Sequence, residues 1–319
     1  MGMVMKKQEM QRLLALVGRL TRAQRQELVD RLKAQTNAEA SVEVLESAGS
    51  QARVCPHCKS QRLVRNGLAD GLQRYKCRAC GKTFNALTGT PLARLRHKDK
   101  WLEQTRALAD GLTVHRAAEF LGVAPSTALR WRHRFLSVPR GVKPASLTGV
   151  AEMDETYFLE SYKGRKVVGR APRKRGGRAA KRGLSREQIP VLVARDRSGV
   201  TTDYVLADGR KAAVMALLKP LLPTDAVVCS DGAGSISQAT KELGLEHHAV
   251  LTSSGKHAVG AWHIQNVNAY HSRLKTWVRR FYGVATYYLE NYLGWFRALD
   301  RMPRNPARPA QLLALALGR

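Results

Sequence analysis

Acidic residues are scarce in this sequence. Its 319 residues include 25 Asp and Glu against 54 Lys and Arg, which gives a formal net charge of +29 at pH 7. An excess of this size is far outside what solubility needs, and it predicts a polyanionic partner: nucleic acid first, an anionic membrane surface second. The charge balance therefore favours a nucleic-acid-binding protein.

Long apolar runs are missing too. No stretch of about 18 apolar residues occurs, so the sequence predicts no transmembrane helix. The start does not resemble a secretory signal, because Lys6, Lys7 and Arg12 interrupt its apolar positions. An apolar content of 44% still allows a sizeable core in two or three domains. We expect a cytoplasmic protein that associates with the nucleoid when it is bound to DNA, with no membrane partner.

Cysteine is rare, and four of the five cysteines form two Cys-x-x-Cys pairs separated by 18 residues. Asn66-Gly67 and Asp70-Gly71 between the pairs are turn signals. Four thiolates at this spacing predict a zinc ribbon with a closed, structural Zn²⁺ site, with a redox pair as the alternative. His57, inside the first pair, is expected to be exposed rather than a ligand. The predicted ligands are Cys55, Cys58, Cys77 and Cys80.

Helical periodicity occurs on both sides of the ribbon. Residues 1–35 predict two amphipathic helices, whose apolar stripe should pack on a neighbour or a second subunit. Residues 36–52 resemble a linker, because they contain few large apolar side chains. The first predicted domain is therefore a helical hairpin with its linker, at 1–52, and the ribbon follows at 53–90.

Residues 91–137 have the pattern of a helix-turn-helix DNA-binding domain. Gly122 marks the turn, and Pro125 begins the recognition helix. The positions expected to pack are Ala128, Leu129, Trp131 or Arg132, and Phe135. The outward positions suit contacts to phosphates and base edges in a major groove. They are Ser126, Thr127, Arg130, and His133 or Arg134. An ordinary three-helix packing unit is the alternative. Residues 138–149 are a predicted linker.

Residues 150–158 predict a strand that carries three acids. Alternation places Glu152 and Asp154 on one face and Glu155 on the other. A carboxylate within a strand is costly to bury unless it is paired or bound to a metal; a solvated edge strand is the alternative. A second apolar strand ends at Asp231. Two carboxylates on neighbouring strands form a site for hard divalent cations such as Mg²⁺.

The segment after the first strand lacks acids altogether. Residues 163–186 contain eleven Lys or Arg and no Asp or Glu. Such a run cannot form a packed core, and it predicts a basic loop that clamps a DNA backbone beside the presumed site. The DNA contacts expected here are Arg173, Lys174, Arg175 and Arg178. Further strands and helices, with one βαβ passage, predict an α/β core over 150–300. The strands are expected at 189–195, 201–206, 226–231 and 246–251, and the helices at 211–218 and 235–243.

A helix is expected over 263–277, with Asn268, His271 and Lys275 within one narrow face. The order of ribbon, helix-turn-helix, Asp154, Ser-Asp231-Gly and Asn268-x-x-His-Ser-Arg-Leu-Lys resembles a bacterial insertion-sequence transposase. Specifically, it is similar to the zinc-ribbon group with an RNase H-like catalytic core of the DDE type. The resemblance covers roughly residues 50–300, including Thr88-Gly-Thr-Pro-Leu and Tyr292-Leu-Gly-Trp-Phe. Residues 301–319 are a predicted C-terminal tail.

The resemblance implies a role for each matching residue. Asp154 and Asp231 correspond to the two metal-binding aspartates, and Lys275 to the basic residue seven positions after the third acidic position. That third position is Asn268 here, where most relatives of the wider class have Glu and some branches have Asn. An amide oxygen adds no charge, so one metal should bind more weakly. The implied cofactors are Mg²⁺ or Mn²⁺ at the catalytic site and structural Zn²⁺ in the ribbon.

The implied activity is two-metal phosphodiester hydrolysis and transesterification on double-stranded DNA. Cleavage at the terminal inverted repeats exposes 3′-hydroxyls, and the same site joins them to target DNA. Lys275 is expected to contact a phosphate; His271 is a ligand or phosphate contact, with a surface histidine as the alternative. Joining two ends predicts at least a homodimer. Two other functions stay open: a catalytically degenerate transposase that only binds DNA, and a structure-selective nuclease.

Overall fold

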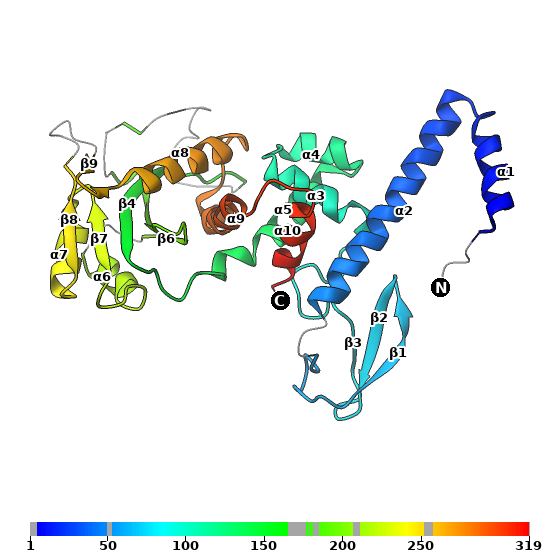
Figure 1. The fold of residues 1–319 in the computed structure, drawn as a ribbon, viewed down its shortest axis with the longest axis horizontal. Coiled ribbons are helices and arrows are strands. Elements are labelled where there is room, and N and C mark those ends of the chain that lie inside the picture. The colour runs from blue at the N-terminus through cyan, green and yellow to red at the C-terminus, as the bar shows by residue number, and fades with distance from the viewer. Residues whose placement is uncertain are drawn as a thin grey trace. The chain divides into compact units, whose positions relative to one another are not determined.

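The computed structural model describes residues 5–49, 53–164, 177, 179–180, 185–206, 211–251 and 258–318. The chain forms two compact units, which Figure 1 draws in colours that follow the sequence. The first unit is Met1–Gly89 with Ala93–Glu103, and the second is Thr90–Leu92 with Gln104–Arg319. Across the described ranges, every helix is too short or too polar to cross a membrane.

The first unit opens with two helices, α1 (Lys7–Val17) and α2 (Arg22–Ala48). Helix α2 continues to Ala48, so the linker predicted over 36–52 is wrong for most of its length. The Ala, Glu, Val and Leu residues of this stretch favour a helix, and Ser41 and Leu45 are fully buried. Helix α1 contains no buried residue, so the packing of its apolar stripe on a second subunit stays a prediction.

The ribbon is a three-stranded antiparallel sheet in the order β1-β2-β3. Its strands are β1 (Leu63–Ala69), β2 (Leu72–Cys77) and β3 (Thr83–Phe84), and the short helix η1 (Lys98–Lys100) follows. Tyr75 stacks on Phe84 with ring centroids 5.7 Å apart, and these rings pack with Cys55 and Cys77. The apolar core of this sheet is therefore small and surrounds the cysteines.

Three helices form the helix-turn-helix: α3 (Trp101–Ala109), α4 (Val114–Leu121) and α5 (Pro125–Leu136). Gly122 ends α4 in the left-handed conformation with φ of 57°, as the turn requires. Leu129 is 44% exposed, so its predicted packing role is wrong. Arg132 is buried instead, because its Nη2 donates to the Leu112 carbonyl at 2.6 Å and its guanidinium lies 4.9 Å from the Phe281 ring centroid.

A five-stranded mixed sheet in the order β6-β5-β4-β7-β8 forms the centre of the second unit. The strands are β4 (Val150–Leu159), β5 (Gln188–Asp196), β6 (Thr201–Val205), β7 (Val227–Ser230) and β8 (Glu246–Ala249). Strands β4, β5 and β6 are antiparallel, whereas β7 and β8 are parallel to β4. The sequence predicts an α/β core in this region, and a mixed sheet is found here. Because β4 is the central strand, the interpretation as a solvated edge strand is wrong.

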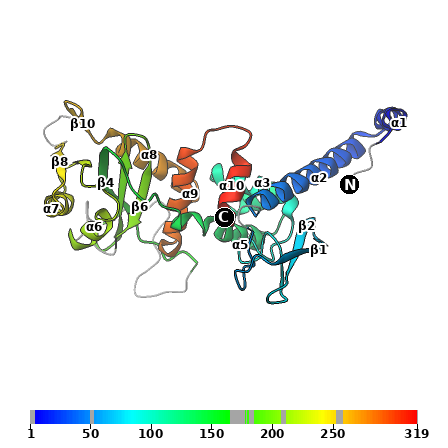
Figure 2. The same cartoon turned by 60° about the horizontal axis from the view of Figure 1, so that its bottom comes forward.

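Helices cover both faces of this sheet (Figure 1 and Figure 2). Helices α6 (Lys211–Leu218) and α7 (Gly234–Glu242) pack on one face, where Ala151 and Met153 join the apolar core. Helices α8 (Gln265–Arg279) and α9 (Leu289–Arg301) contact the other face. The two-residue strands β9 (Ala258–Val259) and β10 (Trp262–His263) precede α8, and η4 (Thr286–Tyr288) precedes α9.

The segment between α5 and β4 is fixed to α9 through the short helix η2 (Pro139–Gly141). A Cβ on Gly294 would lie 2.4 Å from Arg140 N, so only glycine allows this approach. Arg297 donates to the carbonyls of Pro139 and Val142 at 3.0 and 2.9 Å. The same guanidinium forms an ion pair of 2.5 Å with Asp203, and both side chains are buried. The predicted linker is therefore held in place by the core.

The predicted C-terminal tail over 301–319 is wrong, because it contains the helix α10 (Arg308–Leu317). Its apolar residues recur at helical spacing and are buried: Leu312, Leu313, Ala316 and Leu317. The helix contacts α5, and Thr105 Oγ1 donates to the Pro309 carbonyl at 3.2 Å. The end of the chain thus packs on the helix-turn-helix.

Candidate metal and nucleic-acid sites

The four cysteines of the ribbon converge on one point. Their sulfur atoms all lie within 4.8 Å of one another, and the Sγ atoms of Cys55 and Cys80, and of Cys58 and Cys77, are 3.6 Å apart. A tetrahedral site with Zn–S bonds of about 2.3 Å requires sulfurs about 3.8 Å apart. The arrangement fits a structural Zn²⁺, and convergence of all four thiols favours this over a redox pair.

Backbone geometry prepares these thiols for a metal. Each Cys-x-x-Cys forms a tight turn in which the amides of Lys59 and Gly81 donate to the carbonyls of Cys55 and Cys77, both at 2.9 Å. Hydrogen bonding from the Cys80 amide, opposed by burial, lowers the pKa of Cys77 to about 6. A lower pKa favours the thiolate, which is the form that binds metal. His57 is exposed, as predicted.

Two aspartates occupy adjacent positions at the centre of the large sheet. The parallel register of β4 and β7 pairs Met153 with Ser230, so the next position on each strand is Asp154 and Asp231. Neighbouring strands are about 4.8 Å apart, which brings these two half-buried carboxylates to the same edge. One oxygen of Asp154 accepts from the amide of Glu155 at 2.8 Å, and one of Asp231 accepts from the amide of Ala233 at 2.9 Å.

Helix α8 lies over this edge and carries the three remaining predicted site residues. His271 Nδ1 is 3.5 Å from Asp154 Oδ2, and His271 is only 7% exposed, so the interpretation as a surface histidine is wrong. Asn268 and Lys275 are exposed, roughly one helical turn to either side. Burial of its amine lowers the pKa of Lys275, and the charge of Asp154 opposes that shift. Lys275 therefore lies within electrostatic range of Asp154.

The aspartate site differs in ligand number from the ribbon. Among the residues that the structure describes, the cysteines are the one group in which three or more Cys, His, Asp or Glu ligand atoms converge. The aspartate site supplies two carboxylates, with the Asn268 amide as its third predicted ligand. Carboxylate and amide oxygens are the donors that Mg²⁺ prefers, so the donor set fits this cation.

Glu152 is the important residue whose role the sequence did not predict. It is fully buried, and its carboxylate accepts hydrogen bonds from the first turn of α8. The donors are Asn266 N and Asn266 Nδ2, both at 2.8 Å, and Val267 N at 3.1 Å. Arg197 Nε and His263 Nδ1, each 3.2 Å away, complete the surroundings. Glu152 thus supplies the N-terminal cap that α8 lacks in its own sequence.

Glu155 faces the opposite side of β4, as alternation predicts. Its carboxylate accepts from the Tyr157 hydroxyl at 2.7 Å and from Ser235 Oγ, in α7, at 3.2 Å. Burial, reinforced by Glu155, raises the pKa of Tyr157, so this phenol stays protonated. Glu155 is therefore engaged in structural hydrogen bonds away from α8.

The recognition helix exposes a polar side. Ser126, Arg130 and Arg134 are exposed and Thr127 is half-buried. His133 instead stacks on Tyr288 with ring centroids 3.8 Å apart, and burial lowers its pKa. Arg134 is therefore the outward residue of the two alternatives. The predicted contacts of the basic loop lie outside the described residues: Arg173, Lys174, Arg175 and Arg178.

Comparison with known proteins gives two family matches and one relative. Residues 146–297 match the ISXO2-like transposase domain, and residues 98–138 match a homeodomain-like domain. The relative is an uncharacterized protein in transposable element ISH50 of Halobacterium salinarum. It is 27% identical over 266 residues, which is 80% of this chain and 88% of the relative.

Two solved structures show a weak likeness. One is a simian T-cell lymphotropic virus intasome in complex with PP2A regulatory subunit B56 gamma, with 12% identity, 67% of this chain and 66% of that chain covered, and a TM-score of 0.26. The other is a pre-cleavage Mos1 transpososome, with 16% identity, coverage of 68% and 78%, and a TM-score of 0.23. Scores this low do not establish a shared fold.

Proposed function

We propose that this chain is a DNA transposase that cleaves and joins DNA with a divalent metal, supported by the match of residues 146–297 to the ISXO2-like transposase domain. It binds the terminal inverted repeats of its mobile element and performs Mg²⁺-dependent strand cleavage and strand transfer. The observation that supports this most is that Asp154 and Asp231 each follow directly after the paired residues Met153 and Ser230 of two neighbouring parallel strands.

Asp154, Asp231 and Asn268 would hold the metal. Bound there, Mg²⁺ or Mn²⁺ supplies positive charge that activates the attacking oxygen and stabilises the leaving oxygen. The half-buried position of the two carboxylates strengthens their attraction for a cation over that of exposed acids. Because Asn268 contributes a neutral oxygen, the site has one negative charge fewer than a site with three acids, and it should need a higher metal concentration.

The other residues of α8 orient the substrate and the carboxylates. Lys275 is exposed beside the aspartates and binds a phosphate of the DNA strand being cut. His271 contacts one oxygen of Asp154 and so restrains the rotation of that carboxylate. Glu152 holds the start of α8 against β4, which keeps Asn268 at a fixed height above Asp154. Fixed donors of this kind lower the reorganisation needed in the transition state.

DNA recognition is a separate part of the proposal. Ser126, Thr127, Arg130 and Arg134 of α5 contact the element ends, supported by the exposure of this side of the helix. The basic loop adds sequence-independent backbone contacts. Because two ends are joined in one reaction, the working form is at least a homodimer.

The deciding experiment is cleavage and strand transfer with DNA that contains the element's own ends, in Mg²⁺ and in Mn²⁺. Wild-type protein should cut and join, whereas Asp154→Ala and Asp231→Ala should do neither while they retain end binding. Asp225→Ala is the matched control, because Asp225 is an exposed acid just before β7 and should leave activity unchanged. Wild-type protein that binds ends but never cuts them would identify a degenerate transposase, and cutting without joining would identify a nuclease.

The role of Asn268 is tested by a separate series of substitutions in the same cleavage assay. Asn268→Ala should severely impair cleavage, because one metal ligand is lost. Asn268→Asp should retain activity and lower the metal concentration required, since it adds a charged oxygen. Wild-type rates and wild-type Mg²⁺ dependence in Asn268→Ala would remove this residue from the site.

A further inference from the structure

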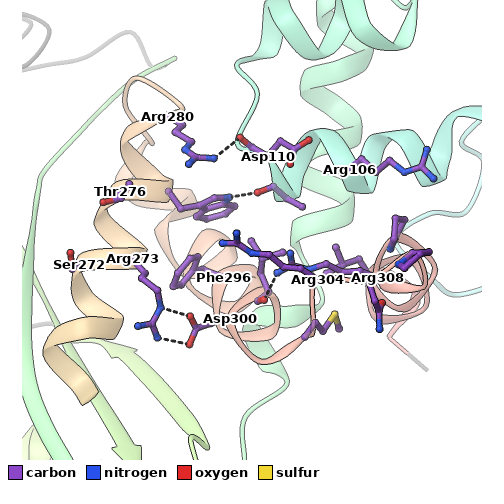
Figure 3. Close-up of a pocket in the computed structure, with 18 residues that line it drawn as sticks. Arg106, Asp110, Ser272, Arg273, Thr276, Arg280, Phe296, Asp300, Arg304 and Arg308 are labelled. Carbon is purple, nitrogen blue, oxygen red and sulfur yellow. Dashed lines mark hydrogen bonds and ion pairs between the residues drawn. The ribbon is translucent and has the colours of Figure 1, made fainter. Parts of the chain in front are cut away.

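Helices α3, α8 and α9 and the start of α10 enclose a cavity of about 690 Å³ (Figure 3). Arginine is the prevalent charged residue of its lining: Arg106, Arg273, Arg280, Arg304 and Arg308. Asp110 and Asp300 are the acids, which leaves a formal excess of three positive charges. Sequence reasoning missed this cavity, because its residues come from distant parts of the chain.

One of the two acids of the lining, Asp300, already forms ion pairs with arginine. Arg273 binds Asp300 through two hydrogen bonds of 2.7 and 2.9 Å, which Figure 3 shows as parallel dashed lines. Arg195 donates to the same carboxylate at 3.1 Å. Asp300 is therefore shared by two guanidinium groups, and it cannot neutralise the remaining arginines.

Of the remaining arginines, Arg280 donates to the Asp110 carbonyl at 3.1 Å, and two others have no ion-pair partner among the described residues. Arg106 and Arg304 are exposed, and neither forms an ion pair with a described residue. Arg308 Nη2 donates to the Leu299 carbonyl at 2.5 Å, yet its Nε is buried without a hydrogen-bond partner among the described residues. Burial and the charge of Arg304 lower the pKa of Arg308, so a negative ligand nearby would be stabilising.

The direction of α10 adds to this positive field. The helix begins at Arg308 with Pro309 at its second position, and its cap has no side-chain hydrogen bond. The start of a helix carries partial positive charge, which favours phosphate, although the amides of Arg308 and Gln311 already donate to carbonyls and Pro309 has none. Arginine adds planar, bidentate recognition of phosphate oxygens. Several arginines around one cavity can each bind a different oxygen of a phosphate group. The lining therefore suits a phosphate better than a carboxylate, which has only two oxygens and one negative charge.

The position of the cavity on α8 separates it from the proposed catalytic residues. At about 100° per residue, Arg273, Thr276 and Arg280 occupy a different side of the helix from Asn268, His271 and Lys275. We propose that this arginine-lined cavity binds a phosphate of the DNA backbone, as a contact distinct from both the recognition helix and the aspartate site. The proposal rests on the DNA-binding part of the proposed function and is independent of the chemistry.

The test removes the two exposed charges together, in Arg106→Gln with Arg304→Gln. Neither residue has a described structural partner, so thermal stability should not change. Binding to a duplex with the element's end and to a scrambled duplex of equal length is measured by fluorescence anisotropy over a KCl series, with zinc-loaded protein and without Mg²⁺ or Mn²⁺. The slope of log K against log salt should become shallower by up to about 0.9 per lost phosphate contact, on both duplexes.

A matched control removes the same charge elsewhere, in Lys219→Gln with Lys241→Gln. These lysines are exposed beside α6 and in α7, across the sheet from α8, so the slope should stay at the wild-type value. An equal loss in both double variants would overturn the proposal, because the effect would then be one of net charge. An unchanged slope in the arginine variant would overturn it too.

A second measurement separates DNA from a small anion. Thermal unfolding is followed with inorganic phosphate, at constant ionic strength. Stabilisation of the wild type but not of the arginine variant, together with an unchanged DNA slope, would make the cavity a small-anion site and overturn the DNA assignment. Omitting Mg²⁺ and Mn²⁺ prevents catalysis during the binding measurement. If the arginine variant shows the shallower salt dependence while wild-type protein never cuts DNA in Mg²⁺, the phosphate contact is supported and the proposed reaction is refuted.

Discussion

The zinc site and the aspartate site are built in opposite ways. All four thiols of the ribbon come from two short turns and already converge within 4.8 Å. The aspartate site takes its residues from β4, from the end of β7 and from α8, which together span more than a hundred residues of sequence. The first site is prepared by local backbone geometry, whereas the second depends on the packing of the whole second unit.

This difference determines how much each site depends on a bound metal for its stability. Without a cation, a thiolate at Cys77 is stabilised by backbone amides and by hydrogen bonds from neighbouring thiols, but paired aspartates repel one another at neutral pH. The ribbon also has only a small apolar core, so its metal must supply much of its folding free energy. The large sheet has an extensive core, so it can hold two like charges in place before any metal binds.

The largest effect should come from breaking the zinc site. Chelation or Cys77→Ser should unfold the ribbon, since structural Zn²⁺ contributes on the order of 10 kcal/mol in zinc fingers, while the large sheet persists. Hydrogen exchange followed by mass spectrometry should show loss of protection in β1 and β2 only. His57→Ala is the control and should keep its zinc. A ribbon that stays protected in metal-free protein would contradict a structural role.

The next effect concerns the residue that holds the aspartate site together. Glu152→Ala leaves the first amides of α8 and the Arg197 guanidinium without their buried partner, which should cost about 3–5 kcal/mol of unfolding free energy. Urea unfolding measures this loss, and exchange of the Asn266 and Val267 amides should accelerate. Glu155→Ala, on the other face of β4, should cost less. Equal losses in the two variants would mean that Glu152 has no special role in anchoring α8.

The smallest effect is the response of the two units to Mg²⁺. At ten times the dissociation constant, a bound cation should stabilise the second unit by about 1.4 kcal/mol and leave the ribbon unchanged. Asn268→Asp should need less Mg²⁺ for the same stabilisation, and Asp231→Asn should need more. Differential scanning calorimetry with MgCl₂ against an equal ionic strength of KCl measures this. Identical Mg²⁺ responses in all three proteins would place the cation elsewhere.

Residues whose role depends on local pattern were predicted well. The cysteine spacing, the turn at Gly122 and the alternation of Glu152, Asp154 and Glu155 all follow from short stretches of sequence. The family resemblance added the expectation of an RNase H-like core and the third site position. The order β6-β5-β4-β7-β8 then places Asp231 beside Asp154, which neither strand reveals alone.

Residues whose role depends on distant partners were not predictable. Alternation places Glu152 on the same face as Asp154, but it does not reveal the helix that covers that face, so the role of Glu152 in holding α8 was not predicted. The end of α2 was not predicted because it is rich in small residues, and helix α10 was not predicted because its apolar run is short. Neither stretch shows in its own sequence that other parts of the chain will bury it. The arginine-lined cavity combines α3 with residues about 200 positions later, which no periodicity indicates.

The close approach of Gly294 to Arg140 has a consequence for where DNA is cut. Together with the bonds from Arg297, it joins the recognition helix to the large sheet through a segment that cannot extend or swing. Under the proposed function, the number of base pairs between the sequence that α5 contacts and the bond that is cut would be set by the distance between these two parts of the second unit. Lengthening this segment should move the cut along the DNA rather than loosen its position.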